Sequence, residues 1–256
     1  MSPRLVLAAA VATPALLACL ASPAMAQDES PFAGLYAGVT LGGAWGDFTG
    51  AATVAPGSGA GVIPSVDAAA INAAAKGSST PSGFTGGVEG GYNLVGGGIL
   101  LGLETDWEAL DLKRGATGTA ISASVAVPLT YTLVSHVHTD WTWTLRPRVG
   151  LTGGSWLVYG TGGLAITDVK SDLTYSDTHN PPRTATVSAS GARTGWVAGL
   201  GAGYALTQSW SVKGEWLYAD FGSISGHVTS SDGFVTIASE ASVKANIFRA
   251  GLDYRF

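Results

Sequence analysis

The segment 248–256 alternates strictly between apolar side chains and side chains that are charged or small. One parity is apolar throughout and the other carries three charges, in the order Phe248, Ala250, Leu252, Tyr254, Phe256 against Arg249, Gly251, Asp253, Arg255. Because successive side chains of a β-strand point to opposite faces, this strand has one apolar and one charged face. About nine residues, tilted by about 45°, just cross the hydrocarbon core of a bilayer. The segment therefore predicts a strand with lipid on one side and a polar interior on the other.

Seven further segments carry the same alternation and are predicted to be strands. The pattern is clear in four of them and weaker in three, which are respectively 99–109, 141–151, 196–206 and 210–218, and 35–42, 84–93 and 156–167. Pro147 lies inside one of the clear segments, and proline lacks the N–H that a closed ladder uses. We therefore expect the pairing to be disturbed at Pro147.

The connections between these segments alternate in length. Short glycine-rich turns are predicted at 94–97, 152–155 and 207–209, and long polar segments lie at 48–82, 111–132, 170–189 and 223–241. Aromatic residues gather at the strand ends, with Trp45, Trp107 and Trp141 on the long-loop side and Tyr92, Trp210, Tyr254 and Phe256 on the turn side. This asymmetry is typical of outer-membrane proteins. The fold class predicted is all-β: a transmembrane eight-stranded antiparallel up-and-down β-barrel with short periplasmic turns and long extracellular loops.

A soluble all-β sandwich or lipocalin-like barrel is the alternative, and it fits the pattern poorly. Its apolar faces would point inward, so the inner face would hold no charges. With the observed parities, a soluble barrel that enclosed the charged face would expose tryptophan, leucine and tyrosine to water. In lipid every backbone amide must be paired internally, and a closed sheet achieves this without helices.

The first 26 residues predict a secretory signal peptide. Arg4 is the only charged residue before Asp28, the segment 5–21 is largely apolar, and 22–26 ends in an Ala-x-Ala pattern. Cleavage after Ala26 would leave a barrel domain of residues 27–256. A membrane anchor and a lipoprotein signal remain as alternatives, the latter because the residues up to Cys19 resemble a lipobox. Cys19 is the only cysteine, so the cleaved chain would have no disulfide or thiol chemistry.

Composition excludes other classes. Only 12% of the residues are charged, about half the usual share, and the formal net charge is −5. A negative chain is a poor partner for nucleic acid. The mean hydropathy of +0.28 argues against disorder.

The charged face of the predicted strands would line the lumen. An eight-stranded barrel has an interior just wide enough for side chains to fill. The residues predicted there are six acids and six bases: Glu89, Glu104, Asp106, Glu108, Glu215, Asp253, Arg146, Arg148, Arg193, Lys213, Arg249 and Arg255. An isolated buried charge is costly, whereas a paired network is tolerable. We expect a charged network that fills the lumen; the alternative is a gate that passes small ions or water.

No catalytic, cofactor or metal site is predicted, and the chain is not expected to be an enzyme. His136 and His138 have a spacing that can hold a metal or a haem edge, but no third ligand is apparent. By strand parity they share the lumen face with Thr142 and Arg146. A lipid hydrolase built on Ser135 would need its catalytic groups to face the lipid. No Gly-x-Ser-x-Gly elbow is present.

Five segments carry a family resemblance that covers the chain after residue 26 in order. They are Gly34-Leu-Tyr-Ala-Gly-Val-Thr-Leu-Gly-Gly43, Tyr159-Gly-Thr-Gly-Gly-Leu-Ala165, the pair 195–204 and 210–218, and Arg249-Ala-Gly-Leu-Asp-Tyr-Arg-Phe256. The chain resembles OmpA-like eight-stranded barrels and, more closely, the porin-family outer-membrane immunogenic proteins of α-proteobacteria. The resemblance implies an outer-membrane location, a structural or surface role, and Phe256 as the C-terminal insertion signal.

The expected function is therefore a structural or surface-interaction barrel of antigen or adhesin type. The alternative is a narrow porin or a protein that takes up a small ligand or haem. Expected partners are outer-membrane lipid, the barrel assembly machinery and host or surface ligands at the loops. The segment 48–82, rich in Ala, Gly, Ser and Pro, is expected to shield the barrel mouth or to present an adhesive surface, with a short helix over 66–75.

Overall fold

The computed structural model describes residues 30–55, 63–122, 128–179, 182–229 and 236–256. The predicted signal peptide lies outside the described residues. The elements are β1 (Gly34–Val54), α1 (Ser65–Ala74), β2 (Gly77–Ser79), β3 (Ser82–Gly96), β4 (Ile99–Ile121), β5 (Thr130–Gly153), β6 (Trp156–Asp177), β7 (Thr184–Ala205), β8 (Trp210–Thr229) and β9 (Thr236–Arg255). The described part of the chain has no helix that is long and apolar enough to cross a membrane.

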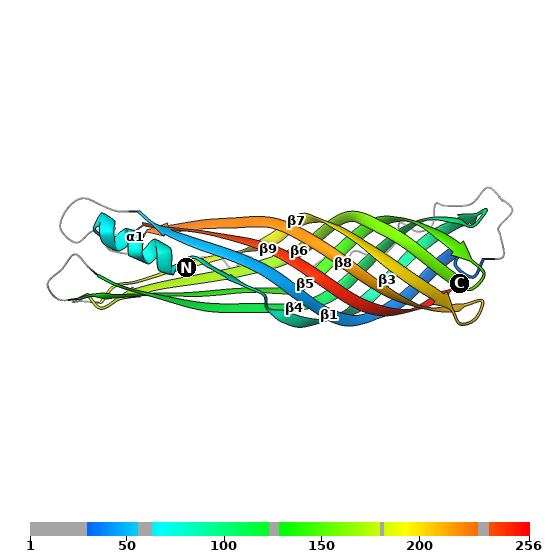
Figure 1. Ribbon diagram of the computed structural model, residues 1–256, viewed down its shortest axis with the longest axis horizontal. Coiled ribbons are helices and arrows are strands. Elements are labelled where there is room, and N and C mark those ends of the chain that lie inside the picture. Colours follow the sequence, from blue (N-terminus) through cyan, green and yellow to red (C-terminus); the bar gives the residue numbers. More distant parts are fainter. Residues whose placement is uncertain (1–29, 56–62, 123–127, 180–181, 230–235) are drawn as a thin grey trace, which may run out of the picture.

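The strands form one antiparallel ring. Neighbours follow chain order from β3 to β9, and β9 pairs with β1 to close the sheet. The short strand β2 lies on the same edge of β1 as β3, and Pro81 separates the two. Since proline has no N–H for the ladder, β2 and β3 act as one interrupted strand. The ring is therefore an eight-stranded up-and-down barrel, as predicted, and it is long and narrow (Figure 1).

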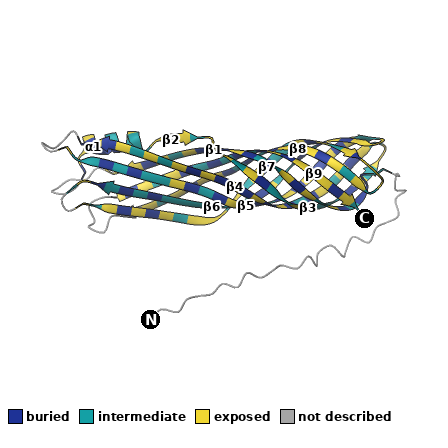
Figure 2. Cartoon of the chain, turned by 90° about the horizontal axis from the view of Figure 1, so that it is seen from below, coloured by how far each residue is buried: buried dark blue, intermediate teal, exposed yellow. Residues whose placement is uncertain are grey.

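The barrel has two halves with opposite hydrophobic patterns, and β9 shows both. Toward the C-terminus Phe248 and Leu252 are exposed while Arg249 is buried. Further up the same strand the buried residues are Val243 and Ile247, on the parity of Arg249. The inward parity is thus continuous, but its chemistry changes from charged to apolar. We call the part with the apolar outer face the membrane half and the rest the outer half. Figure 2 shows how burial alternates along each strand.

Two aromatic belts bound the membrane half. The upper belt contains the pairs Trp45–Phe248, Trp107–Trp141 and Trp196–Tyr218, with ring centroids 5.6, 4.7 and 5.5 Å apart. The lower belt contains Trp210, Tyr254 and Phe256, with centroid distances of 5.0 and 5.3 Å. Amphipathic aromatic rings favour the two membrane interfaces. The predicted girdles on both sides are confirmed in these positions.

The predicted long loops are shorter than the sequence suggested. Much of 111–132, 170–189 and 223–241 pairs as strand, because β1 and β4–β9 have 20 to 24 residues each. The connections at this end are still longer than the turns at the other end, such as Gly97–Gly98 between β3 and β4. The helix expected at 66–75 is confirmed as α1, within the segment that was expected to be a loop.

Register irregularities lie near the boundary between the halves. Bulges occur between Ala109 and Leu112, between His138 and Thr142, and between Asp220 and Ser223. A bulge increases the local twist and re-aims side chains. The disturbance expected at Pro147 is also confirmed, since the ladder from β5 to β6 is interrupted there, while pairing with β4 continues.

Candidate functional site

The lumen of the membrane half holds one continuous ionic network. Arg249 donates to Glu215 from Nε at 2.7 Å, and it also contacts Glu108 and, at 3.2 Å, Asp106. Arg146 bridges Glu104 and Asp106, each at 2.6 Å. The side chains of these residues are at most 1% exposed. The network is therefore sealed from bulk solvent.

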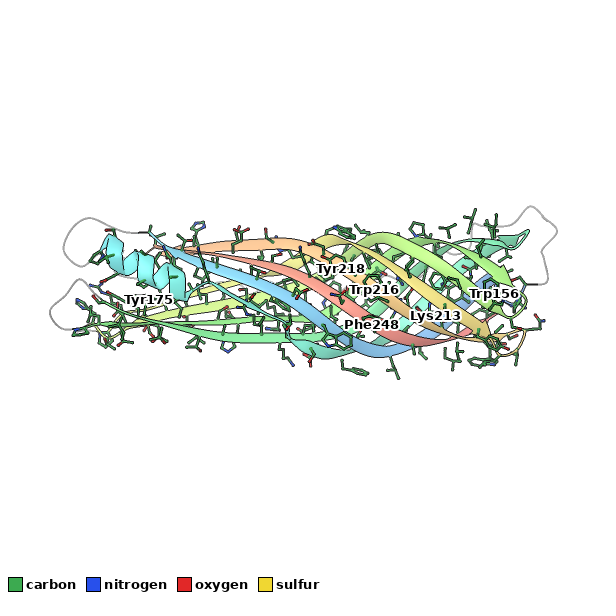
Figure 3. All side chains as sticks on the ribbon, viewed as in Figure 1. Trp156, Tyr175, Lys213, Trp216, Tyr218 and Phe248 are labelled. Atoms are coloured by element: carbon green, nitrogen blue, oxygen red, sulfur yellow. The ribbon has the colours of Figure 1, made fainter. Side chains whose placement is uncertain are left out.

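Glu104 is the centre of this network, because it lies within 4 Å of all four of its bases. The distances are 2.6 Å to Arg146, 2.7 Å to Lys213 and 3.7 Å to Arg249, and Arg148 also contacts it. Lys213 continues to Glu89 at 2.8 Å and to Asp253 at 3.9 Å. Figure 3 shows Lys213 on β8.

Hydroxyl groups satisfy much of the remaining hydrogen-bonding capacity of the acids. Tyr36 donates to Glu104, Tyr159 to Glu215 at 3.1 Å, and Thr144 to Asp106 at 2.8 Å. The guanidinium of Arg148 lies against the rings of Tyr36 and Tyr159, at 4.9 and 4.7 Å. These residues were missed as network members, although their inward parity could have revealed them.

Glycines let the long side chains lie across the lumen. A Cβ at Gly201 would stand 2.3 Å from the ring of Tyr159, which therefore packs directly on the strand backbone. The absence of a side chain at Gly201 therefore leaves the space that the Tyr159 ring occupies.

Ten of the twelve predicted lumen residues lie in this network, and two do not. Arg193 pairs in register with Thr167, at the level of the apolar layer, since Ala165 and Val169 on either side of Thr167 belong to that layer. It forms no ion pair in the described part of the chain, and its Nε has no hydrogen-bond partner there. Arg255 lies at the lower end and donates to the backbone carbonyls of Gln208 and Ala33. The expected balance of six acids and six bases is therefore wrong: the network has six acids and four bases.

The lower end of the lumen is closed by the segment before β1. Phe32 is buried in a cluster with Leu100, Leu157 and Tyr159. Asn93 holds the segment by donating to the carbonyl of Phe32 at 2.9 Å. This apolar lid was not predicted, because a single phenylalanine before a strand carries no periodic signal.

Above the network the lumen is filled by apolar side chains. This layer includes Phe48, Leu110, Leu112, Phe221 and Ile247, all at most 3% exposed. Arg193, opposite the buried Thr167, shares the inward face at this level, and the side chains packed around it are apolar. A hydrated path would therefore have to cross apolar contacts. The outer half is thus packed like the core of a soluble protein.

Helix α1 covers the top of the outer half. Asp67 is buried and accepts hydrogen bonds from Ser122 at 2.7 Å and Tyr131 at 3.1 Å. Asn72 exchanges two hydrogen bonds with the backbone of Val54. Figure 3 shows Tyr175 near this end, where its hydroxyl donates to Asp177 at 2.8 Å. Burial and this contact raise the pKa of Tyr175, which keeps the hydroxyl protonated.

The histidines lie on the outer surface rather than in the lumen. His136 is exposed, and the inward positions beside it are Val137 and Thr139. The bulge before Thr142 shifts the parity of this part of β5, and periodicity alone does not reveal such a shift. Among the described residues, no three His, Cys, Asp or Glu side chains gather to hold a metal ion.

Comparisons with known proteins agree with this geometry. The family model described as "Outer membrane protein beta-barrel domain" matches residues 14–256. The chain belongs to this family of outer-membrane β-barrel proteins. It is 34% identical over 183 residues to the 31 kDa outer-membrane immunogenic protein of Brucella melitensis, covering 69% of this chain and 68% of the relative. It is 31% identical over 139 residues to the 22 kDa outer membrane protein of Rhizobium leguminosarum, covering 54% and 53%.

Solved barrels are similar at low identity. The attachment invasion locus protein Ail of Yersinia pestis is 11% identical with a TM-score of 0.30, covering 85% of this chain and 99% of Ail. The outer membrane protease OmpT of Escherichia coli is 11% identical with a TM-score of 0.42, covering 87% and 97%. The family assignment rests on the family model and the sequence relatives, and it places the protein in the outer membrane of a Gram-negative bacterium.

Proposed function

We propose that this outer-membrane protein is a closed barrel with a structural or surface-interaction role, in which the outer half is the presented surface. The observation that carries the proposal is the filled lumen. Four layers succeed one another along its axis: the Phe32 lid, the ionic network, the apolar layer and α1. Each layer would have to open before a solute could pass. The narrow-pore alternative requires several independent rearrangements.

The outer half supports the surface role. Its strands continue past the upper aromatic belt and turn charged side chains outward, as in the pairs Lys113–Asp111 at 2.8 Å and Lys244–Asp220 at 3.7 Å. A polar wall over an apolar core is stable in water, so this half stands outside the lipid. The Brucella relative is named an immunogenic outer-membrane protein. That name fits a barrel whose outer half meets antibodies or host surfaces.

Lipid and the barrel assembly machinery are the other proposed partners. The exposed apolar residues of the membrane half, such as Leu101, Val149 and Leu200, form the lipid-facing surface. Phe256 is 73% exposed, and its N–H donates to Leu35 at 3.0 Å beside the strand that closes the ring. We propose Phe256 as the terminal signal for insertion.

A non-enzymatic role agrees with the placement of the candidate catalytic residues. Ser135 lines the interior of the outer half while His136 points outward. A serine and a histidine on opposite faces of one strand cannot share a proton. The lipid hydrolase alternative therefore has no nucleophile–base pair at this place.

Conductance tests the closed lumen. The purified barrel in a planar bilayer is expected to give no steady channel current at any holding potential. Steady openings of porin size would overturn the proposal.

Labelling of intact cells tests the presented surface. Lys76 and Lys113 are exposed and Lys170 and Lys244 are half-exposed in the outer half, whereas Lys213 is buried in the lumen. A membrane-impermeant amine reagent is expected to modify the first four in intact cells and to leave Lys213 unmodified until the barrel is unfolded. Protection of all five lysines in intact cells, with labelling only after lysis, would contradict a surface-exposed outer half.

A further inference from the structure

A buried arginine lies between the two apolar cores of the outer half. Arg114 on β4 is 7% exposed and points inward, between the apolar layer of Leu112 and the upper core of Leu133 and Ala120. It forms no ion pair in the described part of the chain. Its one hydrogen bond is long, 3.5 Å from Nη1 to the carbonyl of Phe48, and its Nε has no partner.

This arrangement differs from that of the four bases of the ionic network. Arg146, Arg148, Lys213 and Arg249 each contact at least one carboxylate. Burial lowers the pKa of Arg114 from its ordinary value, since no carboxylate compensates for the loss of water. A buried and uncompensated charge is strongly destabilising. A negatively charged group beside the guanidinium would therefore stabilise it.

A cavity of about 240 Å³ lies against Arg114. Its polar lining includes the hydroxyls of Ser79, Ser135 and Ser171, and Ser79 Oγ is itself buried without a hydrogen-bond partner. Its one acidic lining residue, Glu240, is exposed and sits on the outward parity between Ser239 and Ala241. The donors on the inner wall thus face no carboxylate.

The remaining lining is largely apolar, apart from Lys76, Ser78, Thr117 and Ser239. It includes Ala52, Ala75, Ala116, Leu133 and Val137. At about 30 Å³ for each water-sized group, the cavity has room for roughly eight of them. One guanidinium matches one negative charge, and the alanine and leucine walls match a short aliphatic body.

The barrel wall beside this cavity is completed by α1 instead of a strand. The pairing of β3 with β4 ends at Thr85 and Leu110, and above that level β4 has a strand partner only in β5 among the described residues. On its other edge β4 contacts α1, whose Ala74 carbonyl approaches Gly118 closely. The cavity is lined by the end of this helix and by β2. Movement of α1 would open the wall at the cavity, on the side away from the membrane half.

We propose that the outer half binds a small organic monoanion, a carboxylate with a short aliphatic chain, through Arg114 and the serine hydroxyls beside it. The carboxylate accepts from the guanidinium and Ser79, and the chain lies against the alanine wall. This site is independent of whether the barrel conducts, because the apolar layer separates it from the lumen of the membrane half.

Binding of hexanoate and 1-hexanol to the full barrel in lipid nanodiscs tests the site, with empty nanodiscs as the blank. Equilibrium dialysis of the radiolabelled compounds is expected to show saturable binding of about one hexanoate per chain, at least tenfold tighter than 1-hexanol. Absence of saturable hexanoate binding overturns the proposal. Equal binding of the acid and the alcohol overturns it too, since the site would then not distinguish a carboxylate from a hydroxyl group.

Variants locate the binding. Arg114→Gln is expected to weaken hexanoate at least tenfold and to leave 1-hexanol unchanged. Lys113→Gln, the adjacent outward-facing residue, is the matched control and is expected to bind hexanoate like the wild type. Because Arg114 has no carboxylate partner, Arg114→Gln is expected to fold and to migrate on gels like the wild type. Unchanged hexanoate affinity in this variant overturns the assignment. The comparison of hexanoate with 1-hexanol in the wild type tests the proposal even if the variant does not fold.

Discussion

Removal of Arg249 would break the ionic network at its most connected base. Arg249 contacts Glu215, Glu108 and Asp106 closely, and its Nη2 lies 3.5 Å from Glu89 and 3.7 Å from Glu104. The network already has six acids and four bases, so Arg249→Ala would raise the excess of acids from two to three. Removing one partner of a buried pair typically costs about 3–5 kcal/mol.

Unfolding by urea in lipid vesicles measures this loss. We expect Arg249→Ala to lower the free energy of unfolding by about 3–5 kcal/mol, less if water enters the space that the guanidinium leaves. Lys244→Ala on the same strand is the matched control. Its pair with Asp220 is half exposed at 3.7 Å and should contribute at most about 1 kcal/mol.

Conductance of the Arg249→Ala variant distinguishes a plug from a gate. Conductance of Arg249→Ala should stay near zero, because the Phe32 lid and the apolar layer still close the lumen. If the variant kept wild-type stability and gained conductance, the network would be a gate that re-pairs rather than a plug. The double variant Arg249→Ala with Glu215→Gln should recover part of the stability, since it removes one of the acids left without its partner.

Three further outcomes are expected. The barrel should fractionate with the outer membrane and migrate faster on gels before boiling than after, because a closed ladder resists detergent; recovery as a soluble periplasmic protein would contradict the fold. Deletion of Phe256 should reduce outer-membrane assembly without reducing export, and normal assembly of the truncated chain would argue against the terminal signal. Asp67→Ala should speed hydrogen exchange in α1 at Ser65–Ala74, by removing the acceptor of Ser122 and Tyr131, while the strands of the membrane half stay protected. Asp67→Asn, which keeps one acceptor oxygen, should show a smaller effect, and equal exchange in both variants would place the support of α1 elsewhere.

The membrane half was predictable because one physical rule operates along its whole length. Lipid requires an apolar outer face, so every outward residue of Ile99–Trp107 and 248–256 except Thr105 carries the same signal. Parity then assigns the inner residues correctly, including Glu104, Arg146 and Glu215. Parity alone does not show that Arg193 and Arg255 lie outside the network. It gives the face of the sheet on which a residue lies, but not its position along the barrel axis.

The outer half was mistaken for loops because its outward residues lose the apolar signal. In 236–247 the outward parity holds Thr236, Glu240 and Lys244, and the inward parity holds Ile237, Val243 and Ile247. The alternation persists with its faces exchanged, and small residues such as Ala, Ser and Gly weaken it further. Bulges add a second difficulty, since the irregularity after His138 reverses the faces assigned to both histidines.

One set of continuous strands therefore meets two solvents. The same strand needs an apolar outer face in lipid and an apolar inner face in water, and the exchange takes place near the upper aromatic belt. Below that level, burying charges is the cost of a lipid-facing wall, and Glu104 holds them together by contacting four bases. Above it, the interior can be apolar, so a charge there has no structural purpose in closing the barrel. Asp67 and Asp177 are buried there too, but each accepts at least one hydrogen bond from a neighbouring hydroxyl. Arg114 has no such partner and faces a cavity between two apolar cores, and this is the physical reason for which its position indicates a ligand rather than a packing role.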